Sequence, residues 1–74
     1  MAWDFQDVLL GAAEAEVPRL ERELQDKFAA LRKCTTPDAV ERVARELRRV
    51  ADGLATAHTH RVTAAAHIAA RDGA

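Results

Sequence analysis

The chain has 74 residues and one cysteine, which excludes an internal disulfide framework and leaves one small core to stabilise the fold. Its net charge of −1 gives no overall attraction to nucleic acid or anionic lipid, so a contact of that kind requires a local basic patch. Aromatic residues make up only 4%, and Ala, Leu, Glu and Arg are abundant. This composition is typical of helices and predicts a single all-α domain spanning residues 1–74.

A first helix is predicted over about residues 4–33. Pro18 interrupts its apolar face and removes one backbone hydrogen bond. Because the apolar spacing keeps its phase across Val17 and Leu20, we expect a kink near Pro18. A break there, giving a three-helix bundle, is the alternative. The apolar face consists of Leu10, Ala13, Val17, Leu20, Leu24, Phe28 and Leu31.

A turn at residues 34–36 is predicted to precede a second helix over about residues 37–71. Thr36 is a favourable N-cap, Pro37 suits the first helical position, and Asp38 complements the helix dipole. Gly53 lies inside this helix, where it permits a bend, but the apolar spacing continues across it without a skip. Two helices joined by so short a turn are expected to form an antiparallel hairpin.

The second helix carries one apolar row at alternating spacings of three and four residues, which is the heptad pattern of a packed helix. We call this row the seam. Near the turn, Phe28 and Leu31 are expected to contact Val40 and Val43. Arg61 stands in the seam, with its stem along the row and its guanidinium toward solvent. The seam comprises Val40, Val43, Leu47, Val50, Leu54, Ala57, Arg61, Ala64 and Ile68.

At the other end, large residues are expected to face small ones. The large residues are Trp3, Phe5, Leu9 and Leu10. The small ones are Ala57, Ala64, Ala65 and Ala69.

A second apolar line runs along each helix beside the packed face. On the second helix it contains Ala51, Ala55, His58, Val62, Ala65 and Ala69, and on the first helix Ala2, Phe5, Leu9 and Ala12. A lone hairpin buries one stripe per helix, so the extra lines predict a homodimer that forms a four-helix bundle. A three-helix fold that buries both lines internally is the alternative. The predicted oligomer interface is Phe5, Leu9, Ala12, Ala55, His58, Val62, Ala65 and Ala69.

Arginines gather near the turn. Arg42, Arg45 and Arg49 share one exposed strip, and Arg48 lies beside it. Such a strip can bind phosphates or an acidic protein. Acidic neighbours favour a solvated face with ion pairs instead, in particular Glu41 with Arg45 and Glu23 with Lys27.

No residue pattern points to a metal, a cofactor or a catalytic site. His60 and His67 lie about 10 Å apart along a helix, too far to share one ion, and His58 points elsewhere. Serine and tyrosine are absent, and Cys34 falls in the turn, far from the histidines. We therefore expect a chain that is not an enzyme.

The sequence favours a small cytoplasmic interaction or adaptor protein that self-associates through the open end of the hairpin. The acids Asp4 and Asp7 replace the basic residues of a secretory signal, and no run approaches the roughly 18 apolar residues of a membrane span. A small nucleic-acid-associated regulator is the second interpretation, and an accessory subunit of an enzyme the third. The alanine and arginine content is typical of a GC-rich bacterial or phage genome.

Overall fold

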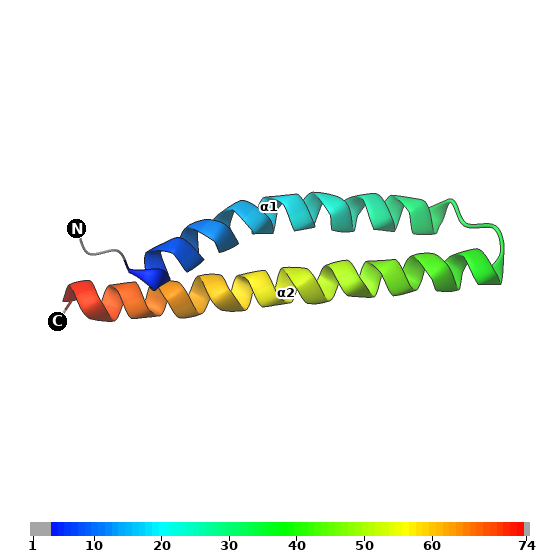
Figure 1. The fold of residues 1–74 in the computed structure, drawn as a ribbon. Coiled ribbons are helices and arrows are strands. Elements are labelled where there is room, and N and C mark those ends of the chain that lie inside the picture. The colour runs from blue at the N-terminus through cyan, green and yellow to red at the C-terminus, as the bar shows by residue number, and fades with distance from the viewer. Residues whose placement is uncertain (1–3, 74) are drawn as a thin grey trace.

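Two antiparallel helices make up the fold in the computed structural model, which describes residues 4–73. Helix α1 spans Phe5–Arg32 and α2 spans Pro37–Gly73. They lie side by side along a rod of 56 × 16 × 14 Å, with the turn at one end and the start of α1 and the end of α2 at the other (Figure 1). The predicted all-helical hairpin is thus present, and α2 continues two residues further than expected. Ala2 and Trp3 lie outside the described residues.

Short-range hydrogen bonds fix where the helices begin and end. The Asp4 carboxylate accepts a bond from the Gln6 amide at 2.9 Å and caps α1. The amide of Lys33 donates to the Ala30 carbonyl at 3.1 Å and ends that helix. Thr36 Oγ1 accepts a bond from the Ala39 amide at 3.2 Å, so the predicted N-cap of α2 is confirmed.

Pro18 does not divide α1. The helix continues through it, and the three-helix alternative is wrong for the described residues. Figure 1 shows α1 bent so that its N-terminal half slopes toward α2. Gly53 likewise lies within an unbroken α2. In each helix the apolar residues before and after the interruption lie on the same face. Packing of that face against the other helix favours a continuous helix through the interruption.

The core is narrow: α1 contributes the buried residues Ala13 and Val17, and α2 contributes one row along the seam. Val43, Val50, Ala57 and Ala64 are buried, and they follow one another at intervals of seven residues. Of the other seam positions, Leu47, Leu54, Arg61 and Ile68 are half-buried and Val40 is exposed. Two helices thus bury one position of each heptad of α2 and leave its companion row partly open.

Phe28 and Val40, which were expected to pack near the turn, are 46% and 41% exposed, so neither belongs to the buried row. Along α1 the half-buried positions pass from Leu24 to Lys27, and Phe28, one residue further, is exposed. Lys27 instead forms an ion pair with Glu46 of α2 at 3.3 Å. The ion pair of Lys27 with Glu46 therefore takes the place of the expected pair of Lys27 with Glu23.

At the open end the expected packing of large against small residues holds for only some positions. Ala57 and Ala64 are buried, but Ala65 and Ala69 are exposed, and Phe5 is 65% exposed. Ala65 follows Ala64 and is rotated from it by about 100°, which takes it off the seam.

Gly53→Ala is expected to raise the stability of the chain. A Cβ at Gly53 would lie 3.8 Å from Leu20 Cδ1, an ordinary van der Waals contact, and alanine is favoured over glycine in a helix by about 1 kcal/mol. Gly11→Ala is the matched control, since a Cβ there meets no atom within 4 Å. In thermal unfolding at one protein concentration, both variants should have a raised Tm, and Gly53→Ala the higher. A lower Tm for Gly53→Ala would contradict the packing at Leu20.

Candidate interaction surface

One flank of the hairpin is hollowed into a groove between the helices. Its volume is about 420 Å³. Small side chains create it, because glycine and alanines occupy positions where larger residues would fill the space between the helices. The lining residues are Leu9, Ala12, Ala13, Glu16, Leu20, Gly53, Thr56, Ala57 and His60. We call this side the groove flank.

The apolar line of α2 lies on the opposite flank. Ala55 and Val62 come two residues after the groove residues Gly53 and His60, and positions two apart on a helix do not share a face. Val62 is 56% exposed. We call this line the α2 stripe: Ala51 and His58 are half-buried, and Ala55, Val62, Ala65 and Ala69 are exposed.

The apolar line of α1 belongs to the groove flank. Leu9 and Ala12 line the groove, and Phe5 continues the same helical spacing. The eight predicted interface residues are therefore divided between two flanks, three on the groove flank and five on the α2 stripe. A single twofold contact can therefore bury only one of the two flanks. The sequence alone did not indicate that the predicted interface residues are divided in this way.

The turn end is basic. Arg42, Arg45, Arg48 and Arg49 are exposed, and none of them forms an ion pair with any residue from 4 to 73. The expected pairing of Glu41 with Arg45 is thus not present. Arg45 and Arg48 instead flank a shallow hollow whose other lining residues are Val40, Glu41 and Ala44.

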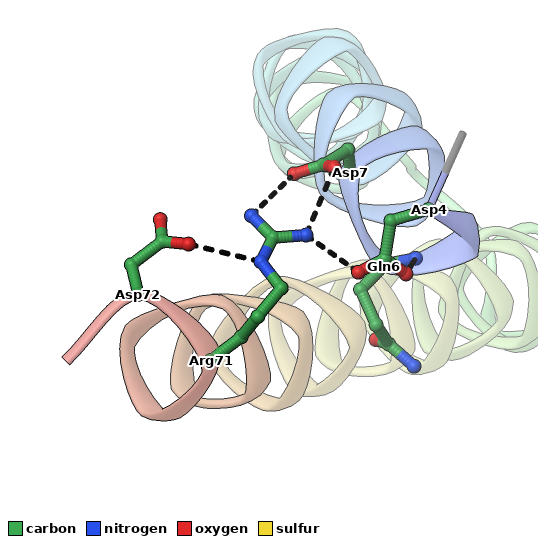
Figure 2. Close-up of polar contacts among 5 residues, drawn as sticks. All are labelled: Asp4, Gln6, Asp7, Arg71 and Asp72. Carbon is green, nitrogen blue, oxygen red and sulfur yellow. Dashed lines mark hydrogen bonds and ion pairs between the residues drawn. The ribbon is translucent and has the colours of Figure 1, made fainter. Parts of the chain in front are cut away.

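Arg71 joins the two helices at the open end. Its Nη1 donates to Asp4 at 2.5 Å and to Asp7 at 3.1 Å, and its Nε donates to Asp72 at 2.9 Å (Figure 2). We call these four residues the Arg71 cluster. Sequence reasoning missed it, although a signal was present: Arg71 follows Ala64 by seven residues and so continues the buried row.

The Arg71 cluster changes the acidity of its groups. The bond from the Gln6 amide and then the bond from Arg71 lower the pKa of Asp4. The three carboxylates raise the pKa of Arg71 above its ordinary value. Gln6 lies in the same region and leaves its Oε1 buried without a hydrogen-bond partner among the described residues.

His58 and Cys34 each form a hydrogen bond with a residue three or four positions away on the same helix or at its end. Arg61 Nε donates to His58 Nδ1 at 3.3 Å, so that nitrogen acts as an acceptor, and Cys34 Sγ donates to the Ala30 carbonyl. In the described part of the chain, no three His, Cys, Asp or Glu side chains gather closely enough to hold a metal ion. Neither described helix contains a stretch that is long and apolar enough to cross a membrane.

No protein-family model, curated protein or solved structure matches this chain. Its function must therefore be inferred from its own residues and their geometry.

Arg71→Gln is expected to raise the pKa of Asp4 while leaving it below the ordinary value, because the bond from the Gln6 amide remains. A lowered pKa in the folded chain contributes stability that is present above the ordinary pKa and is lost as the pH falls through the lowered one. The variant should therefore lose less stability in acid than the wild type does. NMR titration of the Asp4 carboxyl measures the pKa directly.

Arg49→Gln removes an exposed arginine of the same helix that has no bond to Asp4, and it should leave this pKa unchanged. An unchanged Asp4 pKa in Arg71→Gln would show that the cluster does not form in solution.

Proposed function

We propose that this chain is a small cytoplasmic interaction or adaptor protein that works as a homodimer, two hairpins forming a four-helix bundle. The observation that carries the proposal is its exposed area. The chain exposes 5556 Å². A compact monomer of 8.1 kDa exposes about 4,500 Å². The difference, about 1,000 Å², is close to the roughly 800 Å² that each partner contributes to a standard interface.

The pattern of burial supports the same proposal. Each helix of a four-helix bundle packs against two neighbours and buries two rows of side chains, whereas the hairpin buries one. Leu54 and Ile68 are half-buried, and Val62 is exposed. A partner helix against this side of α2 would remove these apolar side chains from water, at about 25 cal/mol per Å² before the costs of association.

Val62→Glu is expected to weaken the dimer, because a twofold contact would bury two carboxylates where the wild type buries two apolar side chains, and taking a charge out of water costs free energy even beside a polar neighbour. Light scattering across a dilution series should show a stable wild-type dimer and a variant that is monomeric at the same concentrations. Ala12→Glu places the same charge on the groove flank and reports whether that flank is covered instead.

Ala70→Glu is the matched control, since Ala70 is exposed, lies on the same helix as Val62, and stands three or four residues from no member of either flank. It should dimerise as the wild type does. A wild type that stays monomeric over the whole series would overturn the proposed homodimer.

The arginines at the turn favour a second candidate, a nucleic-acid-associated regulator. Four exposed arginines without an intramolecular ion pair among residues 4–73 leave their full charge available to phosphates. The net charge of −1 and the nearby Glu41 and Glu46 weigh against it.

For that candidate, a labelled DNA duplex should bind in low salt and dissociate at moderate salt, and Arg42→Gln with Arg45→Gln should reduce both the affinity and the salt dependence. Fluorescence anisotropy measures this. Gln substitutions at Arg19 and Arg22, which lie on α1, form the control. Absence of binding even in low salt would exclude this candidate.

A further inference from the structure

The α2 stripe ends in opposite charges. Arg48 lies three residues before Ala51, and Asp72 lies three residues after Ala69. Both continue the alternating three- and four-residue spacing, so they share the face of the stripe. Both are exposed. From Arg48 to Asp72 the stripe extends over about 36 Å of helix.

The stripe from Arg48 to Asp72 is complementary to a second copy of itself that runs in the opposite direction. A twofold axis that passes between His58 and Val62, perpendicular to the helix, places the stripe opposite its own reversed copy. The two residue numbers in every facing pair then have the same sum. Alanines then face alanines, which permits close approach of the two helices, and each charged end meets its opposite. The facing pairs are Arg48 with Asp72, Ala51 with Ala69, Ala55 with Ala65, and His58 with Val62.

The surroundings of the two ends strengthen this complementarity. At the open end, Asp4, Asp7 and Asp72 surround the single guanidinium of Arg71, so the Arg71 cluster is acidic overall. At the other end, Arg45 and Arg49 accompany Arg48 without an ion pair among the described residues. An antiparallel pair brings each acidic end against a basic end, and a parallel pair would bring like charges together.

We propose that the occupant of the α2 stripe is the α2 stripe of a second copy, packed antiparallel about a twofold axis between His58 and Val62. Arg48 of each copy pairs with Asp72 of the other. This inference rests on the proposed homodimer and specifies its interface. It leaves the groove flank, with Phe5, outside the contact.

Charge exchange between two variants tests the arrangement. Arg48→Asp places two carboxylates opposite each other in its homodimer, and Asp72→Arg places two guanidinium groups opposite each other. Each homodimer should be weakened by about tenfold or more. In a mixture, both contacts of the heterodimer join opposite charges, so native mass spectrometry in low salt should show heterodimer well above the statistical proportion. The double variant Arg48→Asp with Asp72→Arg should regain the wild-type dissociation constant.

Arg42→Asp is the matched control, because Arg42 lies near Arg48 but off the stripe. Mixed with Asp72→Arg, it should give only the statistical proportion of heterodimer. Circular dichroism verifies that every variant is helical.

The outcomes separate the two proposals. A wild-type dimer whose stability neither single variant changes, and whose mixture stays statistical, would overturn the antiparallel α2 contact and leave the homodimer standing. A wild-type monomer at all concentrations would overturn both.

Discussion

The buried row of α2 is the constraint on which the rest of the structure depends. Val43, Val50, Ala57 and Ala64 repeat every seven residues and are the buried residues of α2 within the described chain. The companion row, which includes Leu54 and Ile68, stays half-open because two helices have a single line of contact. Because of this single line of contact, apolar side chains of α2 remain exposed and available to a partner.

The two flanks of the hairpin differ in shape and in chemistry. On one, Gly53 and the alanines of both helices leave a groove with Leu9 at its side. On the other, the α2 stripe presents mainly alanines, with His58 and Val62 near its middle. A contact on the stripe brings two helices close together, whereas the groove can receive a protruding side chain. The same chain therefore offers two surfaces of different kinds.

The two ends of the hairpin carry opposite charge. The Arg71 cluster links α1 to α2 at the open end and leaves excess negative charge there, while the arginines near the turn have no acidic partner in residues 4–73. Each exposed ion pair contributes little to stability by itself. In the proposed dimer, charges at the two ends of the apolar line would favour an antiparallel partner over a parallel one, because electrostatic complementarity at an interface gives specificity more than affinity.

The sequence by itself determined the features that depend on neighbouring residues. Thr36 caps α2, Pro18 stays within α1, and the heptad spacing identifies the buried row, because caps and periodicity act over a few residues. Only the tertiary structure decided the features that depend on how the two helices meet. It turned Phe28 outward and brought Lys27 to Glu46, placed Leu9 and Val62 on opposite flanks, and joined Arg71 to Asp4 and Asp7. Those outcomes follow from two quantities: the rotation of each helix about its own axis, and the axial register that decides which residues of the two helices face each other. The spacing of residues along one helix specifies neither quantity.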